Sequence, residues 1–318
     1  MRVVSGLDSA ASELAGCVLS IGNFDGVHLG HRRILGTAVE LAAERSCPAV
    51  AITFDVHPLA LVAPDRMPPA LTPLDEKLAK MADCGLDATI IARADRRLLG
   101  WTPHEFVERI VVGRFRASCV VEGPSFRYGH GRQGDVETLR ESGARYGFEV
   151  RIVEPMRVET APGRQEMISS SLIRSAIADG KVELAARALG RPYALIGPVV
   201  RGRGLGRRLN YPTANIGVSN QLLPAEGVYA GRATVRGARY VAAISIGRTP
   251  TFHGTSVLVE AYLLDFDDDI YGESMRLEVE RWIRPQQTFS SAEALTRQIE
   301  QDITAVRGIV NPEKSLSR

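Results

Sequence analysis

The first half of the chain alternates short apolar runs with amphipathic stretches. The apolar runs predict buried strands, and the stretches between them repeat apolar residues at helical spacing, as in His31–Arg45. This alternation predicts a parallel sheet covered by helices on both faces, an α/β fold of Rossmann type. The predicted strands are Cys17–Ile21, Ala49–Phe54, Ala88–Ile91, Val120–Val121 and Phe148–Val153, and the further helices are Leu74–Asp83, Pro103–Val112 and Val136–Ser142.

The pattern changes in the second half. Ser169–Gly190 predicts two short helices, and Gly190-Arg191-Pro192 is a break signal. Short strand-like runs follow, separated by turns rich in Gly, Pro and Asp, and they predict a small antiparallel β-barrel. A closing helix is expected over Ser291–Val306, capped by Ser290 or Ser291. We therefore predict two domains, 1–188 and 189–318. The predicted barrel strands are Leu195–Val200, Gly227–Val235, Tyr240–Ile246, Val257–Leu264 and Met275–Trp282.

Composition narrows the class of protein. The 318 residues suffice for two cores, and 45% hydrophobic with 24% charged residues is typical of globular proteins. A net charge of +2 gives no electrostatic case for nucleic acid or a membrane surface, and no apolar run reaches the roughly 18–20 residues of a bilayer span. The charged start does not resemble a secretory signal. The four cysteines form no C-x-x-C pair, so we expect reduced thiols in a cytoplasmic protein. The sequence favours no oligomeric state.

The first candidate site is the segment Gly22–His31, which follows a predicted strand and opens a helix. Glycines allow a tight turn, and the N–H groups of a helix N-terminus favour an anion. His28 and His31 are three residues apart, so they face the same way in a first helical turn. We predict a nucleotide phosphate site in which both imidazoles stabilise a departing pyrophosphate. Its candidate binding residues are Gly22, Phe24, Asp25, Gly26 and Gly30.

This segment has two weaker interpretations. The histidines and glycines can lie together on a turn by chance, although H-x-G-H directly after a strand makes this the weaker interpretation. A metal site is also weaker, because no third ligand has suitable spacing and two histidines alone do not close a site.

The string Asn23–His31 resembles the H-x-G-H signature of the nucleotidyltransferase superfamily and, within it, the bacterial bifunctional riboflavin kinase/FAD synthetase family. Thr53–Pro58, Phe126–Gly129 and Ser169–Arg174 resemble further stretches of that family in the same order, the last its S-S-T-x-x-R motif. The resemblance implies that the first domain is an FMN adenylyltransferase.

The S-S-S-x-x-R stretch has a physical role of its own. Ser170 and Ser171 at a helix start can present hydroxyl and N–H groups to phosphate, and Arg174 adds a fixed positive charge one turn later. The alternative is a plain N-cap followed by a solvated arginine.

The second candidate site lies in Gly204–Asn215. No P-loop motif is present in the second half. Glycines before a rigid proline suit close approach to phosphates, and Gly204, Gly206 and Pro212 are the candidates. Thr213 and Asn215 alternate along an extended segment, so both side chains can face one side. Their neutral oxygens suit Mg²⁺ that is held partly by nucleotide phosphates.

This segment resembles the P-T-A-N signature of the flavokinase barrel, and Gly227–Ala230, Ile246–Phe252 and Arg281–Pro285 resemble other stretches of it. Glu260, which precedes Leu264-Asp265-Phe266, matches the family's E-x-x-x-L-D-F block. The resemblance implies that Glu260 is the base for the ribityl 5′-hydroxyl of riboflavin. Taken alone, Glu260 is more simply a solvent-facing strand residue.

The aspartates of the next segment have one metal-binding interpretation, a Ca²⁺ loop. They lack the Gly and the terminal Glu of an EF-hand, so we interpret them as a turn with a solvated face. These aspartates are Asp265, Asp267, Asp268 and Asp269.

The resemblance spans about Leu19 to Val306 and implies an enzyme that uses ATP and Mg²⁺ to convert riboflavin to FMN and FMN to FAD. Ser125 stands where the family usually has Asn or Asp. Milder departures are Val56, Ser171, Arg203 and the pair Asn210-Tyr211. One alternative is therefore a riboflavin kinase with a weakened adenylyltransferase site. Another, of a different class, is a non-catalytic flavin-binding regulatory protein.

Overall fold

The computed structural model describes residues 1–9, 12–56, 58–62, 64–202, 204, 206, 209–251 and 254–310. The chain divides into two compact units, Met1–Ser169 and Ser170–Arg318. None of the helices in the described ranges has the length and apolar character that a bilayer span requires. Residues of the matched motifs that lie outside these ranges are His57, Arg203, Leu205, Arg207, Arg208 and Phe252.

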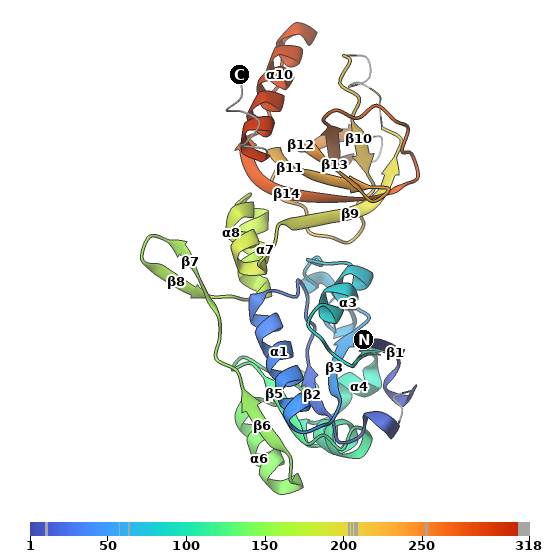
Figure 1. Ribbon diagram of the computed structural model, residues 1–318, viewed down its shortest axis with the longest axis vertical. Helices are drawn as coiled ribbons and strands as arrows, with labels where there is room; N and C mark the ends of the chain where they lie inside the picture. The colour runs from blue at the N-terminus through green and yellow to red at the C-terminus, as the bar shows by residue number, and fades with distance from the viewer. Residues whose placement is uncertain are drawn as a thin grey trace. The chain divides into compact units, whose positions relative to one another are not determined.

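The first unit is built on a six-stranded sheet in the order β1-β4-β3-β2-β5-β6, with every pairing parallel (Figure 1). The five predicted strands are confirmed. The edge strand β1 was not predicted, because only Val4 of its residues is buried and the strand has no apolar run. The strands are β1 (Arg2–Ser5), β2 (Val18–Ile21), β3 (Ala49–Phe54), β4 (Ala88–Ala92), β5 (Cys119–Glu122) and β6 (Glu149–Ile152).

Helices cover both faces of this sheet, as predicted. Alternate residues of β2 point to opposite sides: Val18 packs with Leu35 of α1, and Leu19 packs with Phe106 and Leu139. The helices are α1 (Leu29–Glu44), α2 (Leu59–Val62), α3 (Leu74–Ala82), α4 (Arg96–Gly100), α5 (Pro103–Phe106) and α6 (Val136–Tyr146). Short 3₁₀ turns are η1 (Leu7–Ser9), η2 (Ser12–Leu14), η3 (Pro64–Arg66) and η5 (His130–Arg132).

The helix predicted over Pro103–Val112 differs from a regular α-helix. Thr102 and Glu105 form a capping box that starts α5 as expected. The chain then widens into a π-helical segment, η4 (Val107–Arg114), in which the Phe115 amide donates to the Ile110 carbonyl at 3.0 Å. Residue spacing alone does not distinguish the two windings.

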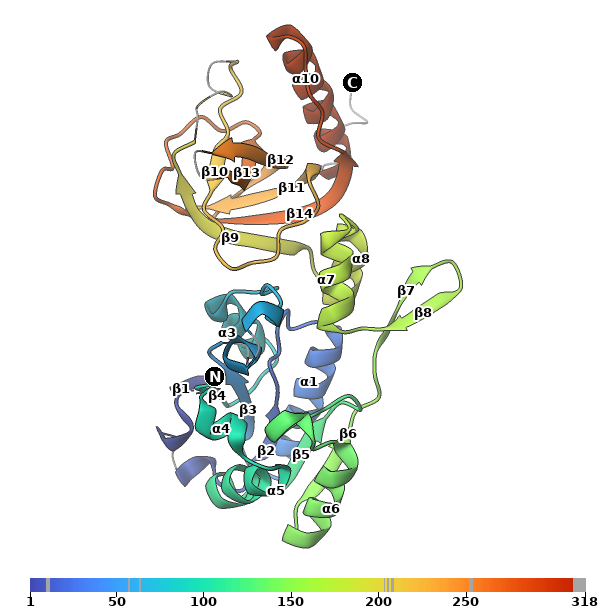
Figure 2. The ribbon, with the colours of Figure 1, turned by 180° about the vertical axis from the view of Figure 1, so that it is seen from behind.

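A hairpin of β7 (Arg157–Ala161) and β8 (Arg164–Met167) stands apart from the sheet of the first unit (Figure 2). The sequence did not predict it, because its residues are mostly polar and exposed, with only Val158 well buried. The strand signal of alternating apolar residues is therefore missing.

The second unit begins with the two predicted short helices and continues as a closed antiparallel barrel in the order β10-β13-β12-β11-β14-β9. Pairing of β9 with β10 closes it. The helix α10 covers one side and buries Val306 and Val310 against Ala230 and Leu264. The elements are α7 (Ser170–Ala178), α8 (Val182–Leu189), β9 (Tyr193–Val200), β10 (Ala214–Ile216), β11 (Gly227–Val235), β12 (Ala238–Thr251), β13 (Gly254–Leu263), β14 (Ser274–Arg284) and α10 (Ala292–Val310).

The predicted barrel and closing helix are confirmed. The Ser291 hydroxyl accepts a hydrogen bond from the Ala294 amide at 3.2 Å, so Ser291 rather than Ser290 makes the capping bond.

Candidate active sites

The segment after β2 is a strained loop held by distant contacts. Phe24 and Val27 have φ values of 46° and 36°, which are unfavourable for residues with a β-carbon, above all for β-branched valine. The Asp25 carboxylate accepts hydrogen bonds from the Leu71 and Thr72 amides at 3.0–3.1 Å. Phe24 is only 2% exposed. Tertiary contacts therefore fix this loop in one conformation.

His28 and His31 meet at the start of α1. His28 is the N-cap residue, and its Nδ1 accepts a hydrogen bond from the His31 amide at 3.2 Å. The two rings stack with centroids 3.6 Å apart. A β-carbon at Gly30 would lie 3.2 Å from the His28 ring, so glycine leaves room for this stack. Gly22 similarly leaves room for the Phe24 ring, also at 3.2 Å.

Both imidazoles are suited to donate hydrogen bonds without carrying a charge. Because His28 Nδ1 accepts, its proton is on Nε2. Burial, together with the neighbouring His28 and Lys77, lowers the pKa of His31 well below its ordinary value. Within the described ranges His31 Nδ1 is buried without a hydrogen-bond partner. A phosphate oxygen placed here would meet neutral donors.

Lys77 of α3 is a residue of this site that sequence reasoning missed. Its ammonium group donates to the carbonyls of Asn23 and Phe54 at 3.2 and 3.0 Å, joining the loops that follow β2 and β3. The side chain is 7% exposed, and burial lowers its pKa to about 8, with Asp25 opposing the shift. The available signal was its position one turn before buried Met81, on the apolar face of a predicted helix.

Glu122 is a second missed residue. It ends β5 next to β2, is 4% exposed, and accepts a hydrogen bond from the Ile21 amide at 2.6 Å. Burial raises its pKa well above the ordinary value of a carboxyl group, although the hydrogen bond from the Ile21 amide opposes the shift. A glutamate at the end of an apolar run was the only sequence signal.

Ser125 lies exposed on the turn that follows β5. The next amide, that of Phe126, donates to the Gly123 carbonyl at 3.1 Å. The rings of Phe126 and Tyr128 stack beside this turn with centroids 5.3 Å apart. The position that departs from the family pattern therefore borders an aromatic surface.

Ser170, Ser171 and Arg174 lie on the first turns of α7, as predicted for a helix start. Ser170 and Arg174 are half-buried, and Ser171 is exposed. The helix α7 belongs to the second compact unit, whereas His28 and His31 belong to the first.

In the barrel, Glu260 of β13 lies between two polar neighbours. It pairs with Asn215 of β10 on one side and with Ser245 of β12 on the other. Asn215 is 7% exposed, and within the described part of the chain its Oδ1 is buried without a hydrogen-bond partner. A buried amide oxygen in that condition is normally satisfied by a bound water or an ion.

A cavity of about 330 Å³ brings several of the predicted residues together. Gly206, Tyr211, Thr213 and Glu260 line it from the barrel side, and α10 closes it. A β-carbon at Gly206 would clash with the Tyr211 carbonyl, which explains the glycine there. Gly204 has φ 70° with open space around it, so its conformation is what favours glycine.

The walls of this cavity are rigid. Arg284 makes a two-pronged ion pair with Asp302 of α10 at 2.7 and 2.8 Å, and the two side chains are only 15% and 8% exposed. Gln286 Nε2 donates to the Ser245 hydroxyl and the Ile246 carbonyl, both at 2.9 Å. Such networks hold a pocket in shape.

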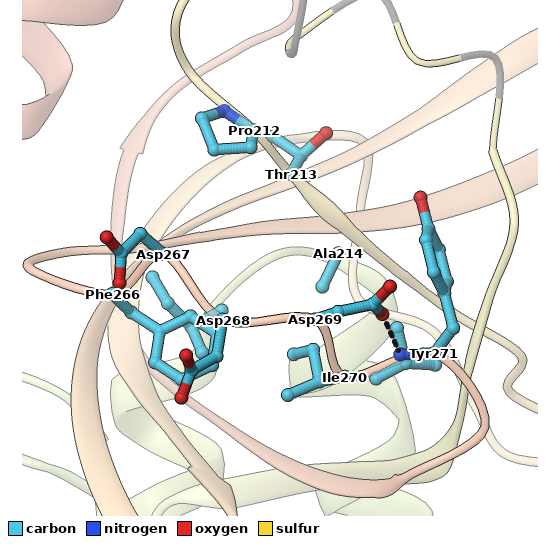
Figure 3. Close-up of a pocket in the computed structure, with 11 residues that line it drawn as sticks. Pro212, Thr213, Ala214, Phe266, Asp267, Asp268, Asp269, Ile270 and Tyr271 are labelled. Carbon is cyan, nitrogen blue, oxygen red and sulfur yellow. Dashed lines mark hydrogen bonds between the residues drawn. The ribbon is translucent and has the colours of Figure 1, made fainter.

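Thr213 and Glu260 each border a further cavity. Thr213 and Pro212 line a small one, of about 80 Å³, opposite the segment Phe266–Tyr271 (Figure 3). There the Asp269 carboxylate accepts from the Tyr271 amide at 3.0 Å, while Asp267 and Asp268 are exposed, as predicted for a turn. Glu260 also lines a cavity of about 360 Å³ with Glu226 and Arg248. Thr213 and Glu260 thus each line two of the cavities.

Comparisons with known proteins agree with the activity expected for each half of the chain. A family model described as FAD synthetase matches residues 10–172, and one described as riboflavin kinase matches residues 189–310. The chain is 37% identical over 316 residues to the bifunctional riboflavin kinase/FMN adenylyltransferase of Escherichia coli K12, covering 98% of this chain and 99% of that protein. The Haemophilus influenzae protein of the same name is 34% identical over 312 residues, covering 98% and 100%.

A solved structure has the same fold over nearly the full length. It is described as a macrolide-efflux protein from Streptococcus pneumoniae and superposes with a TM-score of 0.86 at 29% identity, covering 96% of this chain and 99% of that chain. The activity in that description differs from the one that the curated relatives share.

Proposed function

The chain belongs to the family of bifunctional riboflavin kinase/FMN adenylyltransferases, and we propose that its two reactions take place at the two separate sites described above. It phosphorylates riboflavin to FMN with ATP, and it adenylylates FMN to FAD with release of pyrophosphate. We assign the second reaction to residues 1–188 and the first to residues 189–318. The first family match ends at residue 172 and the second begins at residue 189, which supports this division.

In the adenylyltransferase site, the histidine pair and the loop before it bind the ATP phosphates. An FMN phosphate oxygen attacks the α-phosphorus, the bond to the β-phosphate bridging oxygen breaks, and pyrophosphate leaves with the electron pair. Neutral His28 and His31 donate hydrogen bonds to the charge that forms. The backbone of Gly22 and Gly26 allows close approach.

The remaining groups of this site have supporting roles. Phe24, Asp25 and Gly30 shape the loop, and Ser125 borders the flavin side. The motif that Ser170, Ser171 and Arg174 match supports a role for their hydroxyls and guanidinium in binding phosphate. Fixed positive charge and hydroxyl donors suit this role.

In the kinase site, Glu260 accepts the proton of the ribityl 5′-hydroxyl as that oxygen attacks the γ-phosphorus, and ADP leaves. Glycines 204 and 206, with Pro212, let the backbone approach the phosphates. The observation that carries this assignment is Glu260 paired across the strands with Asn215, whose amide oxygen is buried without a partner.

Thr213 and Asn215 fit a Mg²⁺ ion. Both offer neutral hard oxygens, and the unsatisfied Oδ1 of Asn215 is the structural feature that a cation would satisfy. When bound with ATP, Mg²⁺ supplies charge neutralisation of the phosphates. The described part of the chain has no cluster of three or more His, Cys, Asp or Glu that could hold a metal. We propose that the ion would be held jointly by these two residues and the nucleotide phosphates.

We also propose that the protein acts in the cytoplasm. Its cysteines Cys17, Cys47, Cys84 and Cys119 are all free thiols, which suits a reducing compartment.

The test separates the two activities within one polypeptide. Purified protein is supplied with riboflavin, or with FMN, plus ATP and Mg²⁺, and the flavins are resolved by chromatography. Glu260→Ala should abolish FMN formation and leave FMN-to-FAD conversion intact, and His28→Ala should do the reverse. Residues of the same type that line none of the cavities described above provide matched controls: Glu273→Ala, at a half-buried position, and His104→Ala, at an exposed one, should keep both activities. Loss of both activities in either site variant, with the fold intact, would refute the two-site assignment.

A further inference from the structure

The first unit contains a cavity of about 540 Å³ that is lined by none of the residues assigned above. It lies between the turn after β1, the segment from β4 into α4, and the π-helical η4. Four arginines line it, against two carboxylates, those of Asp8 and Asp95. The Asp95 carboxylate is engaged in capping α4, where it accepts from the Leu98 amide at 2.8 Å. The cavity therefore has an excess of positive charge. Its arginines are Arg93, Arg97, Arg109 and Arg114.

Three of these guanidinium groups are held in place by contacts. Arg97 and Arg109 lie over the indole ring of Trp101, 5.8 and 5.4 Å from its centroid. Cation–π contact orients a guanidinium without occupying its N–H groups. Arg114 Nε donates to the Leu7 carbonyl at 2.8 Å, which ties η4 to the turn after β1. The Glu105 carboxylate lies 3.6 Å from Arg109 on the exposed side of the helix, a weak surface pair.

The π-helical winding is what gathers two of these arginines. Bonding from residue i to residue i+5 aligns side chains five apart, whereas an α-helix aligns those three or four apart. Arg109 and Arg114 are five apart and both line the cavity. Gly113 lies between them, and a β-carbon there would stand 2.9 Å from the Glu108 carbonyl oxygen. Widened turns of this kind are frequent at functional sites.

We propose that this cavity binds a nucleotide, with its phosphates on the arginine cluster and its ring against the apolar wall. The planar guanidinium fork matches phosphate oxygens. Leu98, Ile110 and the indole edge of Trp101 supply the apolar wall, and the volume is ordinary for a small-molecule site. The shared chemistry is an aromatic ring that carries phosphate, which the adenine nucleotides and the flavin nucleotides of this enzyme both possess.

The experiment measures ligand stoichiometry by calorimetry with ADP, FMN and inorganic pyrophosphate as separate probes. The double variant Arg109→Ala/Arg114→Ala should bind one fewer ADP, one fewer FMN, or one fewer of each per chain than wild type. The nucleotide whose stoichiometry falls is the ligand of this cavity. The matched control is Arg96→Ala, which removes an exposed arginine of α4 that does not line the cavity. The circular-dichroism spectrum and thermal unfolding midpoint of each variant, compared with wild type, verify that the first unit, Met1–Ser169, folds.

Tryptophan fluorescence provides a second measurement of binding in the cavity. The chain has two tryptophans, so Trp282→Phe leaves Trp101 as the only one, and ADP should change its fluorescence. If the alanine variant does not fold, Arg109→Lys/Arg114→Lys keeps the positive charge but removes the planar guanidinium fork. The dissociation constant of the bound nucleotide should then rise at least about 10-fold. Equal stoichiometry in the alanine variant and the control for both nucleotides would overturn the proposal. Pyrophosphate binding as tightly as either nucleotide would also overturn it.

Discussion

Gly202→Ala should disable the kinase without altering any residue that touches a substrate. A β-carbon at Gly202 would lie 2.6 Å from Asn215 Cγ and 2.8 Å from its Oδ1, and closer still to Nδ2. Carbon contacts are optimal at about 3.5–4.0 Å, so the amide would have to rotate away. The positive-φ penalty does not enter, because Gly202 is not among the residues with positive φ. The perturbation is therefore purely steric.

Two magnitudes follow from this geometry. Overpacking of this kind costs about 1–3 kcal/mol of unfolding free energy. Displacing the group that orients a metal ligand typically costs about 10–100-fold in metal affinity or activity. We expect FMN formation to fall by that factor and the Mg²⁺ concentration for half-maximal rate to rise.

The assay follows FMN formation from riboflavin over a range of Mg²⁺ concentrations. Conversion of supplied FMN to FAD, assigned to the other site, is the internal control and should keep its wild-type rate. Gly308→Ala is the matched substitution, because a β-carbon there meets nothing within 4 Å and the position is helical. A wild-type Mg²⁺ dependence of FMN formation in Gly202→Ala would refute the assignment of Asn215 as a metal ligand.

Three further predictions concern buried charge. Because burial raises the Glu122 pKa above its unfolded value of about 4.3, the native state binds this proton more tightly than the unfolded chain does. In urea denaturation, the stability advantage of Glu122→Gln over wild type should therefore grow as the pH rises above about 4.3. Because the pKa of Lys77 is lowered to about 8, the unfolding free energy of wild type should rise relative to that of Lys77→Met by at most about 3 kcal/mol between about pH 8 and pH 10.4. A fall of this difference in unfolding free energy over the same range would contradict the prediction. Asp302→Asn leaves the Arg284 charge uncompensated and should cost about 3–5 kcal/mol in chemical denaturation, against under about 1 kcal/mol for exposed Asp265→Asn.

Local patterns in the sequence determined much of the architecture. Buried parallel strands such as β3 are apolar along their length, and amphipathic helices such as α1 repeat every three or four residues, so both are visible in the residue order. The alternation of such elements then fixes the fold class. The H-x-G-H and P-T-A-N segments are also contiguous, and their residue types alone indicate phosphate and metal chemistry.

The tertiary structure decided what depends on residues that are far apart in the chain. The burial of Lys77 against the Asn23 and Phe54 carbonyls exists only once two loops meet, and the raised pKa of Glu122 arises only because its carboxyl group is buried where β5 lies beside β2. The pairing of Glu260 with Asn215 depends on barrel closure. Desolvation and strand register are properties of packing, and no local spacing encodes them.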